Sequence, residues 1–495
     1  MAPMETAELY RDFEACNRAR LARDPRFDGR FFIGVKTTGI YCRPICPAPR
    51  CKRWNVKYYP SAAAAAEAGY RPCLRCRPEA APGTPAWLGT SATVRRGLRL
   101  IQEGALDNGS VEQLAERLGI GPRHLHRLFI RHLGASPLAV AQTRRLHFAK
   151  RLIDDTRLAM TDIALASGFG SLRRFNDAFH KTYGRAPREL RRERSADAAK
   201  ADALTLKFAY RPPYDWAAIR DFLATRAMPG VERVDGDVYA RAVSVNGVHG
   251  WIEVRPVPKE DALELSVHEL GPAALFGIVY RVRQMFDLAA DPADVRQVLK
   301  KDTLLAPLLR RRPGLRVPGA WDPFELAVRA VLGQQVSVAA ARTFAARIVA
   351  HYGTPLAGLG PAAPGELTHL FPAPEVLAKA DLARIGLTTA RAKALNALAA
   401  AVVKREVCFS EAVPGDELRT ALTRIPGIGN WTAEYVAMRA LSDPDAFPAE
   451  DLVLRRVASP RKPLTAKALL ERAEHWRPWR AYAVLHLWRA ASDEN

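Results

Sequence analysis

The segment IPGIGNWTAEY at residues 425–435 places two glycines in a short turn between two helical stretches. Gly427 and Gly429 both suit positive φ in a tight turn, and they let a polymer backbone approach closely. Because the turn opens a helix, free N–H groups and the positive end of the helix dipole point outward together, which favours a phosphate. Trp431 and Tyr435 follow one helical turn apart. The segment therefore predicts a helix–hairpin–helix that binds a phosphate backbone.

A carboxylate follows at Asp451, 22 residues after Gly429, beyond a proline-containing connection that can return the chain beside the hairpin. One carboxylate and two aromatic side chains near a phosphate-binding turn suit chemistry on a base flipped out of a DNA duplex. We interpret Asp451 as a catalytic residue and Trp431 and Tyr435 as part of a base pocket. Core packing is the alternative for each aromatic residue.

The length and net charge of the chain indicate how many domains it has and which class of partner it binds. A chain of 495 residues is too long for one core, and roughly three or four domains are expected. The net charge of +22 favours a polyanionic partner, here double-stranded DNA. No apolar run reaches membrane-spanning length, and the first twenty residues lack a signal-peptide core. We expect a cytoplasmic protein without a membrane partner.

Four of the seven cysteines form two close pairs separated by 26 residues. The pairs are Cys42 with Cys46 and Cys73 with Cys76. Four thiolates at this spacing match a tetrahedral Zn²⁺ site better than disulfides, and a reducing compartment agrees with a metal. The alternative is four unrelated buried cysteines. Cys16 and Cys51 are interpreted as structural or incidental.

The N-terminal segment resembles the zinc-binding domain of the Ada family of methyl-acceptor proteins. The matching positions are Phe31, Phe32, residues 37–44, Cys46, Asn55, Val56 and residues 70–76. The resemblance implies that Cys42 takes a methyl group from a DNA methylphosphotriester, and that Thr38 and Arg71 contact the DNA backbone. Pro47 and Pro49 stand where the family's best-known member has arginines. A zinc ribbon that only folds the domain is the alternative.

Methylation of a zinc-bound thiolate has an electrostatic consequence. A four-thiolate zinc centre is anionic, and methylating one ligand removes one negative charge. Repulsion from the DNA phosphates then falls. The repair event would thereby become a binding switch.

An internal repeat follows, because residues 114–120 and 163–169 resemble each other and lie 49 residues apart. Each leads into a basic helix and a closing glycine turn, which describes a helix-turn-helix. The doubled arrangement resembles the AraC-type DNA-binding domain. The recognition residues are expected among Arg123, His124, Arg173 and Arg174, with base and phosphate contacts both open. A purely structural helical bundle is the alternative.

Beyond residue 203 the pattern changes to an α+β segment and then to helices. Alternating residues at 204–208, 238–243 and 251–254 predict strands, and a helix is expected near residue 214. The small, charged residues 193–202 are interpreted as a flexible linker. Asp322 and Pro323 predict a helix start.

The region from 204 to about 490 resembles the AlkA type of 3-methyladenine DNA glycosylase, a helix-hairpin-helix enzyme. Besides the hairpin and Asp451, the matching segments are residues 212–216, 239–241, 333–339 and 476–488. The resemblance implies catalysis by Asp451 and a base pocket that includes Trp488 beside Trp431 and Tyr435. It places Gln335 where a relative inserts a wedge residue into the duplex.

The absence of a lysine in the hairpin helix and of further cysteines limits the reactions expected of the C-terminal half. Related enzymes that also cleave the strand carry a lysine where Trp431 stands, so a monofunctional hydrolase is expected. Cys408 is the only cysteine beyond residue 76, so no iron–sulfur cluster is expected in the C-terminal half. Cys408 also lacks the Pro-Cys-His-Arg context of the second Ada methyltransferase domain, so repair of O6-methylguanine is not expected.

The sequence thus predicts a multidomain, mainly α protein with α+β parts. The expected units are a zinc methyl-acceptor domain at 1–82, a double helix-turn-helix at 89–192, a linker at 193–202, an α+β subdomain at 203–318 and a helix-hairpin-helix glycosylase domain at 319–495. The function expected is methyl capture, transcriptional activation with RNA polymerase as partner, and excision of alkylated bases. The alternatives are a regulator with an inactive glycosylase half, and a repair enzyme with a nonspecific DNA tether.

Overall fold

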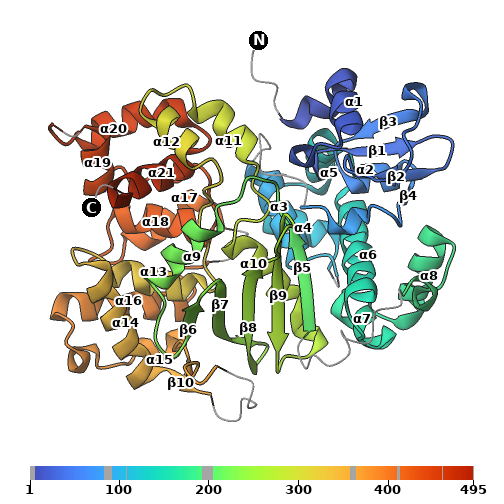
Figure 1. Cartoon of the computed structure of the whole chain (residues 1–495). Helices are drawn as coiled ribbons and strands as arrows, with labels where there is room; N and C mark the ends of the chain where they lie inside the picture. Colours follow the sequence, from blue (N-terminus) through green and yellow to red (C-terminus); the bar gives the residue numbers. More distant parts are fainter. Residues whose placement is uncertain are drawn as a thin grey trace.

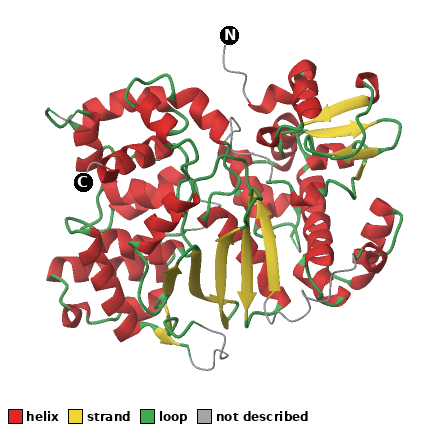
Figure 2. Ribbon diagram, viewed as in Figure 1, coloured by secondary structure: helices red, strands yellow, loops and turns green. Residues whose placement is uncertain are grey.

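The computed structural model describes residues 6–82, 92–107, 109–191, 204–356, 364–409, 413–459 and 461–493. The linker predicted at 193–202 lies outside these ranges. Figure 2 shows a mainly helical molecule with a small sheet near the N-terminus and a larger sheet at its centre. The predicted mixture of α and α+β parts is confirmed. None of the helices in the described ranges combines the length and the apolar character needed to cross a bilayer.

The first part, up to residue 82, builds a four-stranded sheet with two flanking helices. The central strand β1 pairs antiparallel with β2 and β3, and β4 pairs parallel with β2. Cys42 is the last residue of β2, so the sheet fixes the start of the first cysteine pair. The elements are α1 (Phe13–Ala22), β1 (Phe32–Val35), β2 (Ile40–Cys42), β3 (Val56–Tyr59), α2 (Ala62–Glu67) and β4 (Arg71–Pro72).

The next part is all helical and confirms the predicted repeat. Gly134 and Gly184 end α5 and α8 in the left-handed conformation, with φ of 67° and 66°. Both helices bury three residues at four-residue spacing, so each presents one apolar face and one basic, exposed face. The helices are α3 (Ala92–Gln102), α4 (Val111–Arg117), α5 (Pro122–Leu133), α6 (Pro137–Asp155), α7 (Met160–Ala166) and α8 (Leu172–Tyr183).

The central sheet has five antiparallel strands in the order β5-β9-β8-β7-β6. The three strands predicted from alternation are β5, β7 and β8, and the helix expected near residue 214 is α9. The elements are β5 (Leu204–Ala209), α9 (Trp216–Ala224), β6 (Glu232–Asp235), β7 (Val238–Val245), β8 (Val248–Pro256), β9 (Ala262–His268), α10 (Leu275–Met285), α11 (Pro292–Leu299) and α12 (Leu305–Arg311).

The last part is a helical array with a two-stranded ribbon. Asp322 caps α13 through the backbone N–H of Glu325, which confirms the predicted helix start. Helices α11 and α12 share a core with α18, α19, α20 and α21, although they precede residue 318. The elements are α13 (Pro323–Leu332), α14 (Val338–Tyr352), β10 (Thr354–Pro355), β11 (His369–Leu370), α15 (Pro374–Leu377), α16 (Thr389–Val403), α17 (Gly415–Thr423), α18 (Asn430–Ala440), α19 (Leu452–Ala458), α20 (Ala466–Ala473) and α21 (Arg480–Asp493).

One hydrophobic core joins the second helix-turn-helix to the central sheet. It contains residues of α6, α7 and α8 together with residues of β5, β7, β8, β9 and α10. The rings of Phe148 on α6 and Phe276 on α10 meet edge to face, with centroids 5.1 Å apart. Figure 1 shows α6 and α7 beside this sheet. The DNA-binding helices and the α+β part are therefore packed together, which the sequence pattern did not predict.

Polar contacts dock the N-terminal part onto the same body. Arg30 pairs with Asp291 at 3.3 Å and with Asp294 at 3.0 Å. The guanidinium of Arg211, which is fully buried, donates to the backbone oxygen of Asp28 at 2.9 Å. These charged groups are shielded from solvent, so they fix the docking geometry more firmly than exposed pairs do.

The shared core predicts a large effect for Phe148→Ala. The side chain is 8% exposed and packs on Phe276, so its removal leaves a cavity and should cost about 3 kcal/mol of unfolding free energy. Leu165→Ala is the matched control, because Leu165 is 66% exposed on α7. Urea denaturation measures both. Equal, small losses for the two variants would contradict the shared core.

Candidate active site and candidate metal centre

The glycine hairpin lies between α17 and α18, as predicted. Gly427 has φ of 89°, but Gly429 has φ of −97° and forms the N-cap of α18, so the prediction of positive φ is wrong for Gly429. A Cβ on Gly429 would meet nothing within 4 Å. This glycine therefore leaves open space in front of the helix N-terminus, where a phosphate fits. Gln334 fixes the hairpin by donating to the Gly427 carbonyl at 3.1 Å and to the Thr432 hydroxyl at 2.8 Å.

Asp451 is held by two hydrogen bonds, one to each carboxylate oxygen. It is the N-cap of α19, where Oδ1 accepts the N–H of Leu454 at 3.0 Å. Oδ2 accepts the indole N–H of Trp431 at 2.8 Å. The return loop is anchored because Glu434 accepts the backbone N–H of Phe447 at 3.0 Å. The hairpin helix thus orients the carboxylate directly through Trp431.

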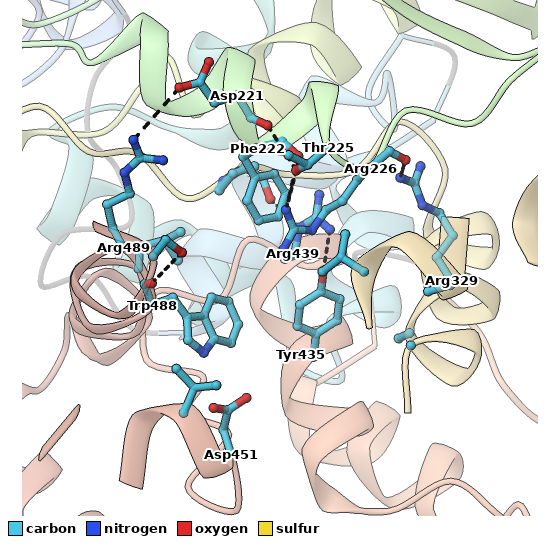
Figure 3. Close-up of a pocket in the computed structure, with 18 of the residues that line it drawn as sticks. Asp221, Phe222, Thr225, Arg226, Arg329, Tyr435, Arg439, Asp451, Trp488 and Arg489 are labelled. Atoms are coloured by element: carbon cyan, nitrogen blue, oxygen red, sulfur yellow. Dashed lines mark hydrogen bonds and ion pairs between the residues drawn. The ribbon is translucent and has the colours of Figure 1, made fainter. Parts of the chain in front are cut away.

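Asp451 lines a cavity of about 670 Å³, together with the three predicted aromatic residues. Trp431 and Tyr435 stack in parallel, with centroids 5.2 Å apart and an interplanar angle of 11°. Trp488 on α21 lies 6.1 Å from Tyr435, tilted by 49°. Figure 3 shows Tyr435, Trp488 and the Asp451 carboxylate around the same hollow. A flat base can stack against the exposed faces of such rings, with the carboxylate at its edge.

Arginines form the other wall of this cavity. The guanidinium of Arg439 donates to the Tyr435 hydroxyl at 2.7 Å, and that of Arg226 lies 3.9 Å from the centroid of the Phe222 ring. Burial acts to raise the pKa of Tyr435, but the positive charges of Arg439 and Arg226 outweigh it and lower that pKa. Sequence reasoning missed these arginines, because they come from separate segments and carry no motif of their own.

Two further residues lie outside the cavity lining. Gln335 is exposed just beyond α13 and has φ of 56°. It precedes Val336, which lines the cavity, and its backbone carries the strain of a left-handed residue. Its role as a wedge stays a prediction. Glu450 is exposed and accepts only a long hydrogen bond from Asn430, at 3.4 Å. Asp451 is therefore the carboxylate of this pair that faces the cavity.

The four paired cysteines come together in a single cluster. The Sγ atoms of Cys42, Cys46, Cys73 and Cys76 all lie within 4.8 Å of one another. Four thiol donors at this spacing fit a tetrahedral Zn²⁺ ion. Cys51 and Cys16 are outside the cluster, and burial raises the pKa of Cys16 to about 12.

Neighbouring side chains order the metal centre. The backbone N–H of Arg43 donates to Cys76 Sγ at 3.3 Å, and its guanidinium donates to the Cys76 carbonyl at 3.0 Å and pairs with Asp28. Tyr41 precedes Cys42 and lies hydrogen-bonded to His147 of α6 at 2.7 Å. The cysteine cluster is therefore in contact, through one side chain, with the helix that joins the two helix-turn-helix units.

The predicted DNA contacts occupy exposed positions. Thr38 and Arg71 flank the cysteine sheet, where the Arg71 N–H donates to the Gly39 carbonyl at 2.8 Å. The four predicted recognition residues are exposed in the first turns of α5 and α8, namely Arg123, His124, Arg173 and Arg174. Figure 1 places α8 and α19 at opposite sides of the molecule, so the recognition surface and the Asp451 cavity are separate.

Family models match four consecutive regions of the chain. They are the metal binding domain of Ada at 15–79, a helix-turn-helix domain at 114–193, the AlkA N-terminal domain at 205–322 and the HhH-GPD superfamily base excision DNA repair protein at 328–480. The chain therefore contains a zinc-binding Ada domain, a helix-turn-helix and both parts of an AlkA-type glycosylase fold.

Curated relatives match the whole chain or one half of it. DNA-3-methyladenine glycosylase 2 of Escherichia coli is 37% identical over 56% of this chain and 95% of its own. The bifunctional transcriptional activator/DNA repair enzyme Ada of E. coli is 35% identical over 34% of this chain and 47% of its own. The solved structure of a 3-methyladenine DNA glycosylase from Archaeoglobus fulgidus shares the fold of the C-terminal half, with a TM-score of 0.50, 22% identity, and coverage of 57% of this chain and 96% of that one.

One relative matches this chain over almost the whole length of both proteins. The probable bifunctional transcriptional activator/DNA repair enzyme AlkA of Mycobacterium tuberculosis (strain H37Rv) is 40% identical over 485 residues, which cover 97% of both chains. The present chain therefore belongs to this family of bifunctional transcriptional activator and DNA repair enzymes.

Proposed function

We propose that the chain excises alkylated bases of the 3-methyladenine type, takes methyl groups from DNA methylphosphotriesters on Cys42, and activates transcription through its helix-turn-helix units. The observation that carries the excision activity is the Trp431–Asp451 hydrogen bond of 2.8 Å at a cavity with stacked aromatic walls. The names of the relatives support the same substrate class, since one is a 3-methyladenine glycosylase.

The excision step needs little acid catalysis. An alkylated purine is positively charged, so it leaves as a neutral base and takes the electron pair of the glycosidic bond. Positive charge then develops on the sugar, and Asp451 stabilises it. Water adds its oxygen to C1′ and releases a proton. Trp431 holds the carboxylate in place, while Tyr435 and Trp488 stack on the flipped base.

Methyl transfer uses the sulfur of Cys42. When bound, zinc keeps this sulfur deprotonated at neutral pH. The Sγ atom attacks the methyl carbon, an S–C bond forms, and the methyl–oxygen bond breaks. The phosphodiester leaves with the electron pair as an anion. Cys42 is 8% exposed at the end of β2, between the expected backbone contacts Thr38 and Arg71.

Activation would follow from the loss of one negative charge at the cysteine cluster. The zinc domain then approaches DNA more closely, while α5 and α8 engage a promoter. We infer that RNA polymerase is the partner of the methylated protein and that the cytoplasm is its compartment. The exposed first turns of α5 and α8 support promoter binding, because Arg123 and Arg173 lie there.

Asp451→Asn tests the excision site. The amide removes the negative charge that faces the developing cation, so base release should fall roughly 100- to 1,000-fold. Binding to alkylated duplex should be retained. Glu450→Gln is the matched control and should keep wild-type activity, because Glu450 is exposed beside the site. Release of 3-methyladenine from methylated DNA is the measurement. Full activity of Asp451→Asn would show that another group is catalytic.

Cysteine variants test the acceptor and the metal site separately. Cys42→Ala should abolish methyl incorporation from a methylphosphotriester, and Cys51→Ala should leave it unchanged, because Cys51 lies outside the cluster. Cys76→Ala should instead lower the zinc content and destabilise the domain. Mass spectrometry locates the methyl group, and metal analysis counts zinc. A methyl group on Cys51 of the wild type would refute the acceptor assignment.

A further inference from the structure

A second cavity, of about 300 Å³, lies where the zinc domain, the helix-turn-helix part and α10 meet. Its walls include residues 61–63 and 78–79 of the zinc domain, residues of α3 and α6, and residues 276–284 of α10. None of the functions proposed above uses this cavity. Its lining is strongly basic, with five arginines and one carboxylate among the described residues: Arg95, Arg99, Arg144, Arg151, Arg283 and Glu79.

The single carboxylate is already engaged. Glu79 lies 3.3 Å from Arg77 and 3.9 Å from Lys150, and its side chain is 3% exposed. Arg77 and Lys150 are not part of the cavity wall. The negative charge of Glu79 is therefore shared between the cations behind the wall and Arg151, so one carboxylate does not balance five arginines.

Two of the arginines have protein partners that explain their presence. Arg144 pairs with both oxygens of Asp107, at 2.5 and 2.7 Å, and also donates to the Ile101 carbonyl. Arg99 donates to the Ser442 carbonyl at 3.2 Å and so ties α3 to the glycosylase part. A third arginine, Arg95, lies close enough to Asp443 for its charge to lower the pKa of that carboxyl. These contacts are structural, and Arg151 and Arg283 remain to be explained.

Arg151 is under-coordinated. It is 6% exposed, and its Nε lies 3.5 Å from Asp155, a carboxylate that also binds Arg77 at 2.8 Å. The Nη2 atom has no hydrogen-bond partner in the described part of the chain. One face of the guanidinium is covered by the ring of Phe208, 4.3 Å away. A buried N–H without an acceptor costs free energy, and Arg151 lies in the cavity wall, so an anion bound in the cavity would offset part of this uncompensated charge.

Arg283 is a further cation in the wall and, unlike Arg151, pairs with no carboxylate among the described residues. It donates to the backbone carbonyl of Pro82. Burial, together with the nearby positive charges of Arg151 and Arg211, lowers the pKa of Arg283 to about 9. Mutual repulsion between partly buried arginines is relieved by an anion placed between them.

We propose that this cavity binds a small phosphorylated anion through Arg151 and Arg283. Guanidinium groups bind phosphate through paired N–H donors, which suits the donors left over here. The volume accepts inorganic phosphate or a compact nucleoside monophosphate. Phe32, Phe148 and Phe276 supply an apolar wall, on which the base of a nucleotide would rest.

The position of the cavity means that a bound anion would affect how the parts of the chain pack together. Because three parts of the chain form the walls, a bound anion would stabilise their docked arrangement. His147 also lines the cavity, and it contacts Tyr41, the residue before Cys42. Anion binding would therefore act on the contact between the methyl acceptor and the helix-turn-helix part.

Calorimetric titration of the full-length, zinc-loaded protein tests the proposal. Inorganic phosphate and adenosine monophosphate are titrated in separate arms in chloride buffer. Binding of at least one is expected, with an affinity reduced about tenfold by Arg283→Met or Arg151→Met, since each variant removes a charged hydrogen bond. Tighter binding of the nucleotide would identify it as the ligand, and equal binding would identify phosphate alone.

Two control variants locate the bound anion. Arg226→Gln alters the Asp451 cavity and Arg173→Gln alters the exposed face of α8, so both should bind as the wild type does. No binding in either arm, or losses equal to those of Arg283→Met in these controls, would overturn the proposal.

Stability provides a readout that does not depend on the affinity of an arginine variant. Thr143→Phe keeps every charge but fills the cavity, so phosphate or nucleotide should no longer raise its melting temperature. In buffer without phosphate, Arg283→Met should melt no lower than the wild type, because it removes an unpaired cation. A ligand-induced rise in Thr143→Phe equal to that of the wild type would refute the site.

Discussion

The hydrophobic core between the helix-turn-helix part and the central sheet is the constraint on which the arrangement depends. Phe148 and Phe276 lie in this core, and the buried residues of α7, α8, β5 and β9 continue it. Apolar burial is non-directional, but close packing makes it specific. The ion pairs of Arg30 with Asp291 and Asp294 then place the zinc domain on the same body. Two chemically unrelated sites therefore share one scaffold.

The two proposed reactions differ in what happens to the negative charge of the reacting side chain. In the proposed excision reaction, Asp451 faces a cation that develops only during bond cleavage, and the residue is regenerated in each cycle. In the proposed methyl transfer, Cys42 loses negative charge when it is methylated, and the S–C bond that forms is a stable thioether. On this proposal, excision turns over many times, whereas methyl capture happens once per chain. Their separation across the molecule in Figure 1 allows each to meet its own stretch of DNA.

Local patterns predicted most of the elements and both sites. The spacing of the four cysteines was enough to predict that they form one cluster. The sequence also placed Asp451 beside the glycine hairpin, and in the structure the Trp431 indole N–H makes that contact. The docking of the parts was not predictable, because Phe148 and Phe276 are 128 residues apart and each reads as an ordinary apolar residue of its own helix. The conformation of Gly429 was mispredicted, since helix capping needs no positive φ. The arginines around Tyr435 were missed because tertiary contacts alone assemble them.

The most direct test of one chain with two chemistries is a count of both products in a single reaction. Full-length protein is incubated with excess duplex DNA that carries methylphosphotriesters and 3-methyladenine, and released base and protein-bound methyl are measured over time. The account predicts many bases released per chain and at most one methyl group per chain, held on Cys42. Base release that stops at one per chain, or methyl incorporation that never occurs, would contradict it.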